Sequence, residues 1–370
     1  MAKNPLTSRA KTQEAAASVA AIDLFCGAGG LTHGLEMAGI DVALGVDLDP
    51  ACTYPYEANN TARFLLKSVS DVTKEEVGKF FDASEFSLLA GCAPCQPFSK
   101  YRLGKSDESD DRWHLLAQFQ RLVRETKPDI VTMENVPRLK REAVFASFIS
   151  SLRAQGYTVW NDVVNCSDHG VPQQRERLVL LASRLGPISL RPTAFSRKTV
   201  KEAIGDLPAI GAGETCSTDP LHQASELSPL NFSRIKASTP GGTWRDWDPK
   251  LVAECHKKKS GKTYPSVYGR MRWEEPSPTV TTQFFGFGNG RFGHPEQDRA
   301  LSLREGAILQ SFPKEYKFCE PGEPIFRKTI GRLIGNAVPV KLGEAIGNCV
   351  LEHVKAHAGS EKRRRHVAGK

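Results

Sequence analysis

The sequence predicts an α/β fold with a mostly parallel sheet, together with a smaller, loop-rich second domain. Two observations lead to this prediction. Short apolar runs alternate with helical patterns from residue 20 to about residue 183, which is typical of a parallel sheet with helices on both faces. Beyond residue 185 Pro, Gly, Ser and Thr become frequent and long periodic segments disappear, until a helical pattern returns after Leu303.

The predicted elements follow one another in the order strand, helix, strand. Each strand is a short apolar run, and the first helix is closed by Gly39, a residue common just past helix ends. The predicted strands cover residues 20–25, 41–46, 87–90, 129–133 and 178–182. The predicted helices cover residues 31–39, 113–126 and 339–355.

These patterns divide the chain into four parts. Residues 1–19 are expected to form a mobile leader. The first domain covers residues 20–185 and is completed by residues 329–355, whereas the second domain covers residues 186–328. Residues 356–370 form a basic tail.

Composition and charge narrow the class of protein. With 370 residues, 40% of them hydrophobic, the chain can bury a sizeable core and is not disordered throughout. The formal net charge of +8 suits an anionic partner such as nucleic acid, although part of the excess lies at 361–365 and could be a solvated end. The nine cysteines have no regular spacing, so reduced thiols are expected, and no signal peptide or membrane span is predicted.

A glycine-rich turn follows the first predicted strand. Asp23–Gly30 has the sequence DLFCGAGG, and its glycines allow a ligand to approach the backbone closely. The dinucleotide-binding pattern is not met, because its last glycine would fall on Thr32. Asp47 and Asp49 end the next strand, where a carboxylate can accept hydrogen bonds from ribose hydroxyls. Together these features favour a nucleoside-bearing cofactor over a tight turn flanked by surface acids.

A second loop, Cys92–Ser99, has the sequence CAPCQPFS and allows several interpretations. Two cysteines separated by two residues can bind zinc, but no second pair and no histidine pair accompany them. A thioredoxin-type redox site would place Cys95 in a helix, which Pro97 disfavours. Two buried thiols in a turn are the commonest outcome. A nucleophilic Cys95 would need a proton donor, basic residues and a cofactor site close by.

Such helpers are predicted at the same edge of the sheet. Glu134 follows the apolar run Ile130–Met133 and therefore sits at the carboxyl end of a strand, where ligands bind in open parallel sheets. Arg175 and Arg177 alternate on an extended segment and are expected to face one side. A solvated acid and a charged sheet edge are the plain alternatives. Because Cys95 and the glycine turn would lie at the same edge of the sheet, a role for Glu134 in catalysis is favoured.

In its motifs and their order, the sequence resembles the DNA (cytosine-5) methyltransferases of bacterial restriction–modification systems. The similarity covers about residues 20–355. One departure is Arg112-Trp113, where many members carry Arg-Gly. This departure concerns the behaviour of the loop Ser99–Arg112 and not the chemistry. The matching motifs are Phe25–Gly30, Pro94-Cys95-Gln96, Glu134-Asn135-Val136, Gln173-x-Arg175-x-Arg177, Arg270–Trp273 with Pro276–Thr279, Leu309–Pro313 and Gly335–Pro339.

The resemblance implies a Rossmann-like, S-adenosylmethionine-dependent methyltransferase fold and methylation of carbon 5 of a flipped-out cytosine in duplex DNA. Cys95 would add to carbon 6 of the base as a thiolate. Glu134 would donate a proton to ring nitrogen N3, which requires a raised pKa. Arg175 and Arg177 would stabilise the developing negative charge. The chemistry requires no metal.

The resemblance also implies which residues hold the methyl donor. Phe25 would lie against the adenine, Asp47 would accept from the ribose hydroxyls and Asp71 would bind the exocyclic amine. Leu48, beside Asp47, is a further hydrophobic wall. The complete set of expected cofactor contacts is Phe25, Gly27, Gly29, Asp47, Leu48, Asp71 and Asn336.

By the same resemblance the first domain is catalytic and cofactor-binding, and the second is a target-recognition domain. Contacts with DNA are expected from Gln96, Ser99, Arg270 and Arg272. Further candidates in the second domain are Trp244, Arg245, Trp247, His256–Lys259 and Phe284–Arg291. The lysines among them would bind phosphates, unless they only form a solvated face.

The implied setting is bacterial, cytoplasmic and nucleoid-associated, with duplex DNA as the partner, no membrane, a monomeric state and a cognate restriction endonuclease encoded nearby. A tRNA-type cytosine-5 methyltransferase is the alternative, but the Cys-Phe-Thr motif typical of that group is not found in the second domain. A non-catalytic DNA-binding relative is a second alternative, against which the intact Cys95 and Glu134 argue. A thiol oxidoreductase is a distant third.

Overall fold

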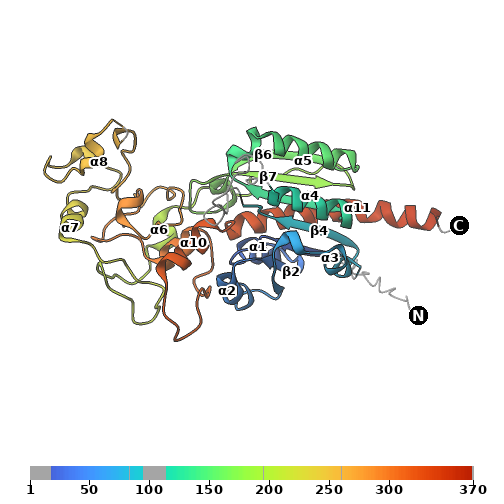
Figure 1. Ribbon diagram of the computed structural model, residues 1–370, viewed down its shortest axis with the longest axis horizontal. Helices are drawn as coiled ribbons and strands as arrows, with labels where there is room; N and C mark the ends of the chain where they lie inside the picture. The colour runs from blue at the N-terminus through green and yellow to red at the C-terminus, as the bar shows by residue number, and fades with distance from the viewer. Residues whose placement is uncertain (1–17, 83, 95–113, 195, 260, 369–370) are drawn as a thin grey trace, which may run out of the picture.

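The structure is a computed structural model that describes residues 18–82, 84–94, 114–194, 196–259 and 261–368, with the backbone alone for residues 359–368. The sheet and its helices form one part of the molecule, and the segment that carries α6, α7 and α8 extends away from it (Figure 1). No helix within these residues is both long enough and apolar enough to cross a membrane.

Most predicted elements are present within one or two residues of their expected bounds. The strands are β1 (Val19–Leu24), β2 (Asp41–Asp47), β3 (Arg63–Leu66), β4 (Phe86–Gly91), β5 (Ile130–Asn135), β6 (Thr158–Asn165) and β7 (Glu176–Ser183). The helices are α1 (Gly30–Ala38), α2 (Thr53–Glu57), α3 (Lys74–Phe81), α4 (His114–Thr126), α5 (Ala143–Ala154), α6 (Val200–Ile204), α7 (Pro229–Lys236), α8 (Glu254–Lys257), α9 (Leu303–Leu309), α10 (Arg327–Asn336) and α11 (Val340–Ala368).

The strands of the described chain form one sheet in the order β3-β2-β1-β4-β5-β7-β6. The pairs β1–β2, β1–β4, β2–β3 and β4–β5 are parallel, whereas β7 runs antiparallel to both of its neighbours. The predicted mostly parallel sheet is therefore confirmed. The chain proceeds outward from β1 to β3 and then returns to β4, so the strand order reverses between β1 and β4. Open α/β sheets bind ligands in the crevice at such a reversal.

Alternate strand residues face two separate cores. Leu88 and Ile130 pack in a core with α1 and α11, whereas the adjacent Leu89 and Val131 pack in a core with α3, α4 and α5. A strand with helices on both faces has no side that faces solvent, and this explains why the sequences of these strands are almost continuously apolar.

Helix α11 returns the end of the chain to the first domain. Gly34 of α1 lies so close to α11 that a Cβ there would come within 2.3 Å of the Val340 carbonyl oxygen. This contact brings Asn336, at the end of α10, into the same part of the fold as β1. The expected bounds 329–355 for this contribution remain a prediction.

The second region has a core of its own that also includes residues of the first. Phe284, Leu301 and Leu309 pack in one cluster with Ala28 and Cys52, which flank the ends of β1 and β2. The two regions are consequently joined by apolar packing beside the glycine turn. The expected boundaries at 185 and 328 stay predictions.

Four expectations on the elements were wrong or incomplete. Val19 is buried in β1, so the leader ends before residue 19. The last helix does not end at Lys355 but continues through Ala368, because no proline follows Lys355 and the one glycine between it and Ala368, Gly359, does not stop a segment rich in Lys and Arg. The edge strands β3 and β6 were missed, since both are largely half-exposed and lack a continuous apolar run.

Candidate active site

The carboxyl ends of three neighbouring strands carry the predicted chemistry. Strand β1 leads into the glycine turn, β4 leads into Cys92–Pro94, and β5 ends with Glu134 and Asn135. Because β1, β4 and β5 are adjacent and parallel, these segments meet at one edge. This strand order explains why Glu134 and the glycine turn lie at the same edge of the sheet, as expected.

The glycine turn alternates between ordinary and left-handed backbone conformations. Phe25, Gly27 and Gly29 have φ values of 60°, 55° and 89°, and the positive value at Phe25 is strained for a residue with a side chain. A Cβ at Gly27 would meet no atom within 4 Å, so this residue faces open space where a ligand can approach. Gly29 is different, because a Cβ there would lie 2.5 Å from Nδ2 of Asn60. Its left-handed backbone and this close approach both favour glycine at position 29.

Asp47 holds the turn. Its Oδ2 accepts a hydrogen bond from the backbone N–H of Gly27 at 2.9 Å, and its Oδ1 accepts one from the N–H of Asp49 at 2.9 Å. Burial raises the pKa of the Asp47 carboxyl group. Each oxygen has a second lone pair, so ribose hydroxyls can still be accepted.

A second acid, missed by the sequence reasoning, lies beneath the turn. Asp23 is buried in β1 and accepts a hydrogen bond from the Thr32 hydroxyl at 2.8 Å, while its Oδ1 has no hydrogen-bond partner among the described residues. Burial raises the pKa of Asp23 to about 7. The feature of the sequence that could have indicated a role for Asp23 is an acidic residue within an apolar strand, close to the glycines.

Three other expected cofactor contacts are accessible. Leu48 follows β2 with 58% of its surface exposed, Asp71 ends a short 3-10 turn and is exposed, and Asn336 is exposed at the end of α10. Exposure leaves all three side chains available to a ligand, and their contacts remain predictions.

Glu134 is the best-defined group at the edge. It is buried, with 4% of its surface exposed. The Nε of Arg177 lies 2.8 Å from Oε1 of Glu134, and the Sγ of Cys92 donates to Oε2 at 2.9 Å. A charged donor and a thiol thus hold the two carboxyl oxygens separately.

Cys95, Gln96 and Ser99 lie outside the described residues. The chain that leads to Cys95 is anchored, because Nδ2 of Asn135 donates to the Ala93 carbonyl at 2.8 Å. This bond joins the loop after β4 to the end of β5, beside Glu134. Asn135 belongs to one of the matching motifs, but this bond could not be inferred from the sequence.

Arg175 and Arg177 do not share partners, although both were expected to stabilise charge on a substrate. The guanidinium of Arg175 is buried and donates at 2.9 Å to each of two backbone carbonyls, those of Val280 and Gly335. Burial, and next the positive charge of Arg177, lowers the pKa of Arg175 to about 10. The contacts of Arg175 join the segment before β7 to the second region and to α10. Of the two arginines, Arg177 is the one that contacts Glu134.

The expected DNA contact by Arg270 has no support in the structure. Arg270 is buried, donates to four backbone carbonyls and forms an ion pair with Asp298. Reaching DNA would leave these buried carbonyls unpaired, which is costly. Trp244 and Trp247 are buried as well, so neither presents a free ring to DNA.

Arg272 keeps the exposure that a DNA contact requires. About half of its side chain, 51%, is exposed, and it forms an ion pair with Glu275 at 2.9 Å. With Arg291 it lines a pocket of about 270 Å³. Burial, and next the charge of Arg272, lowers the pKa of Arg291. Two guanidinium groups held near each other favour the binding of an anionic group in this pocket.

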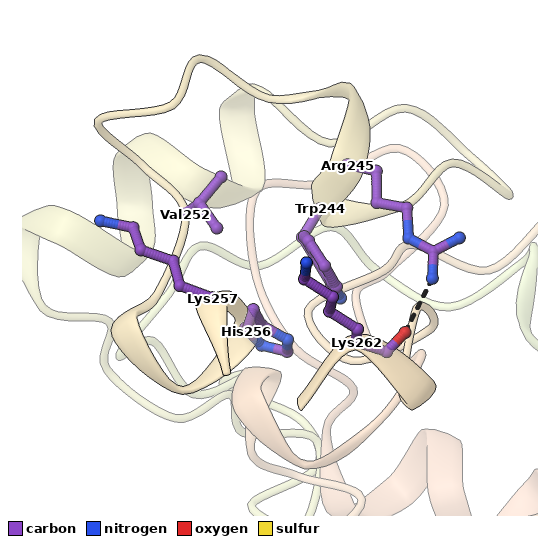
Figure 2. Close-up of a pocket in the computed structure, with 6 residues that line it drawn as sticks. All are labelled: Trp244, Arg245, Val252, His256, Lys257 and Lys262. Atoms are coloured by element: carbon purple, nitrogen blue, oxygen red, sulfur yellow. Dashed lines mark hydrogen bonds between the residues drawn. The ribbon is translucent and has the colours of Figure 1, made fainter. Parts of the chain in front are cut away.

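A larger pocket of about 480 Å³ lies around α8 (Figure 2). The rings of Trp244 and His256, which are tilted by 37° with their centres 4.5 Å apart, form a buried wall. Arg245, Lys257 and Lys262 are exposed around them, and Arg245 donates to the Lys262 carbonyl at 2.7 Å. The lining is thus apolar inside and positive at the rim.

Replacing Asp47 with alanine is expected to weaken binding of S-adenosylmethionine by roughly 10- to 150-fold, from about 1.5–3 kcal/mol for a hydrogen bond to a charged group. The change removes the acceptor for the ribose and also the anchor of Gly27. Isothermal titration calorimetry of the donor with the purified protein measures this directly.

The matched control is Asp49→Ala. Asp49 accepts from the N–H of Ala51 and forms an ion pair with Arg332, so its charge, unlike that of Asp47, is already paired with a cation of the protein. A dissociation constant unchanged by Asp47→Ala but raised by Asp49→Ala would assign the ribose to Asp49 instead.

Known proteins resemble the chain over most of its length. The sequence profile of the family described as C-5 cytosine-specific DNA methylase matches residues 19–352. The Type II methylase M.HgiDII of Herpetosiphon aurantiacus is 51% identical over 337 residues, which cover 90% of this chain and 94% of that protein. The Type II methyltransferase M1.HphI of Haemophilus parahaemolyticus is 32% identical over 90% of this chain and 87% of its own.

Solved structures share the fold. A prophage-encoded Escherichia coli protein considered to be a DNA modification methyltransferase superposes with a TM-score of 0.69 at 23% identity, over 91% of this chain and 100% of its own. A mutant of Spodoptera frugiperda DNMT2 superposes with a TM-score of 0.64 at 19% identity, over 90% of this chain and 99% of its own. At these identities the similarity concerns the fold alone.

Proposed function

The chain belongs to the C-5 cytosine-specific DNA methylase family, and from this premise we propose that it methylates carbon 5 of a flipped-out cytosine in a specific duplex DNA site. It would act as the modification enzyme of a restriction–modification system, beside a cognate endonuclease. The observation that carries the proposal is the buried Glu134, held by Arg177 at the edge where the glycine turn and the Cys92–Pro94 segment meet.

The residues at the end of β1 fit the methyl donor expected of this family. Gly27 faces open space, Asp47 retains lone pairs, and the buried Oδ1 of Asp23 has no partner among the described residues. S-adenosylmethionine supplies an electrophilic methyl group when bound. In this proposal Phe25 and Leu48 flank the adenine, Asp47 accepts from the ribose, and Asp71 and Asn336 make the remaining polar contacts.

The proposed reaction begins with Cys95. Its thiolate forms a bond to carbon 6, and the electrons of the 5,6 double bond are displaced toward N3 and carbon 5. Glu134 donates a proton to N3, which neutralises the charge that would otherwise develop there. Carbon 5 would then form its bond to the methyl group as the bond between that methyl group and the sulfur of the donor breaks, which leaves S-adenosylhomocysteine. A base removes the carbon 5 proton, N3 returns its proton to Glu134, and the bond between carbon 6 and the Cys95 sulfur breaks. The thiolate and the proton donor are thereby restored.

Arg177 would orient the acid during these steps. Its Nε donates to Oε1 of Glu134, and its planar guanidinium has further N–H groups on the same fork for an oxygen of the base. Arg175 contributes indirectly, because its bonds to Val280 and Gly335 join the two regions on either side of the substrate.

Duplex DNA would lie between the sheet edge and the second region. Stacked bases cannot reach the edge of the sheet, so the target must leave the helix at a cost of a few kcal/mol. In this proposal Arg272 and Arg291 bind phosphates or bases, and the positive rim around α8 binds phosphates, which the charged residues lining the two pockets support.

Removing two of the three positive charges of that rim, in Lys257→Ala/Lys262→Ala, is expected to weaken DNA binding without changing the methylated sequence, because phosphate contacts carry no sequence information. The slope of log affinity against log salt should become shallower by about 1.8, since each phosphate that a lysine neutralises contributes about 0.9 to the slope. Fluorescence anisotropy of labelled duplexes between low and high salt measures it.

The matched control removes two lysines from α3, which lies at the opposite end of the molecule from α8 (Figure 1). Lys74→Ala/Lys79→Ala has the same net charge, and both lysines are exposed. If the two double variants reduce the salt slope equally, the effect is one of net charge and the pocket is not a DNA contact.

The proposed function itself is tested with the unmodified protein and a labelled methyl donor. Transfer to duplex DNA but not to tRNA is expected, and sequencing of the methylated DNA would identify the recognised site. Transfer to tRNA alone would establish the tRNA-type alternative.

A further inference from the structure

We propose that Cys92 is a positioning residue for the acid group of Glu134, an inference that rests on the proposed function of Glu134 as proton donor. The Sγ of Cys92 donates to Oε2 of Glu134 at 2.9 Å, while Arg177 occupies Oε1 at 2.8 Å. The carboxyl group is therefore held from two sides, by groups at the ends of different strands.

This arrangement determines which oxygen carries the proton. The Nε of Arg177 is a donor only, so a proton on Oε1 would face another donor hydrogen. When Glu134 is an acid its proton consequently resides on Oε2, the oxygen that contacts Cys92. A thiol can donate a hydrogen bond to a carboxylate oxygen and can accept one from a carboxylic acid. Cys92 thus matches both protonation states of Glu134 without moving.

The backbone around Cys92 is fixed from both sides. Its N–H donates to the Leu24 carbonyl at 3.2 Å, next to the glycine turn, and the following carbonyl, of Ala93, accepts from Asn135 at 2.8 Å. The thiol is presented to Glu134 by this frame. Without the thiol, the carboxyl group of Glu134 should adopt this orientation for a smaller fraction of the time, while the fold around it remains.

The contact also separates the roles of the two cysteines in the CxxC pattern. A thiolate at position 92 would face the negative charge of the Glu134 carboxylate at 2.9 Å, which disfavours it. Cys92 is accordingly a hydrogen-bond partner, and the nucleophile is left to Cys95.

The test compares Cys92→Ala with Cys92→Ser in methylation of duplex DNA. The alanine variant should lose about tenfold in kcat, a part of the effect of a general acid. Its KM values for DNA and for the methyl donor should change by less than about twofold, because a positioning residue acts through Glu134 and not on either substrate. Serine can also donate and accept, so Cys92→Ser should recover most of the lost kcat. Unchanged kcat in Cys92→Ala, or equal losses in both variants, would overturn the proposal.

A second readout does not depend on activity. The infrared S–H stretching band of Cys92, identified as the band missing in Cys92→Ala, should shift when Glu134 becomes glutamine. A band that does not move shows that the thiol and the carboxyl group are not bonded, and so overturns the proposal. Glu134→Gln alone tests the proposed function, since full activity in that variant would remove Glu134 as proton donor whatever the band does.

Discussion

Cys95→Ala is expected to abolish methylation, with a loss of at least about a thousand-fold in the rate of methyl transfer. Carbon 5 of cytosine is a poor nucleophile until sulfur adds to carbon 6, and alanine has no group that can add. The glycine turn is held by Asp47, so binding of the methyl donor should persist. Filter-binding assays of labelled methyl transfer to duplex DNA measure the rate, and calorimetry with the donor measures binding.

Two other cysteines serve as comparisons. Cys255 is exposed in the second region, so Cys255→Ala should match the unmodified protein. Cys92→Ser should lose far less than Cys95→Ala, because its contact with Glu134 can be replaced by a hydroxyl group. Equal losses at positions 92 and 95 would contradict the assignment of a single nucleophile.

The fold and the place of the site could be predicted because they depend on local patterns. Apolar runs such as 130–133 mark strands, and parallel strands bring their carboxyl ends to one edge. The apolar strand before Glu134 therefore indicated where this side chain would lie, at the same edge of the sheet as the turn after β1. Short edge strands such as β3 lack that pattern, and their pairing depends on neighbours distant in the sequence.

The roles of individual arginines could not be predicted in the same way. Arg175 and Arg177 are two residues apart, yet the partners of Arg175 lie 105 and 160 positions away, whereas Arg177 contacts Glu134. Arg270 and Arg272 differ likewise, because the first is buried in a network of carbonyls and the second is exposed. Burial of a charged residue depends on tertiary packing, which a motif does not report.

Duplex DNA with 5-fluorocytosine at the target is expected to accumulate a stable covalent complex with the protein. Once carbon 5 has received the methyl group, the base must remove a proton from that carbon before sulfur can leave. Fluorine cannot leave as a cation, so the complex persists at this stage. A band of reduced mobility in denaturing gels, dependent on S-adenosylmethionine, measures it.

The complex should depend on the residues of the proposed mechanism. Cys95→Ala should form none, since no sulfur–carbon bond can arise. Glu134→Gln should slow its formation by about 10²- to 10⁴-fold, because an amide is a poor proton donor to N3. Lys257→Ala/Lys262→Ala should form the complex at a normal rate once DNA is saturating, since that variant affects binding and not chemistry. These three results separate the nucleophile, the acid and the DNA contacts in one assay.

The outcome also distinguishes the two substrates. The complex should form with duplex DNA and not with tRNA, and it should decrease at high salt as phosphate contacts are screened. A complex that forms equally well with Cys95→Ala would mean that another thiol is the nucleophile, and it would contradict the mechanism proposed for Cys95. A complex that forms with tRNA alone would contradict methylation of DNA by this chain, while leaving the shared chemistry of Glu134 and Arg177 intact.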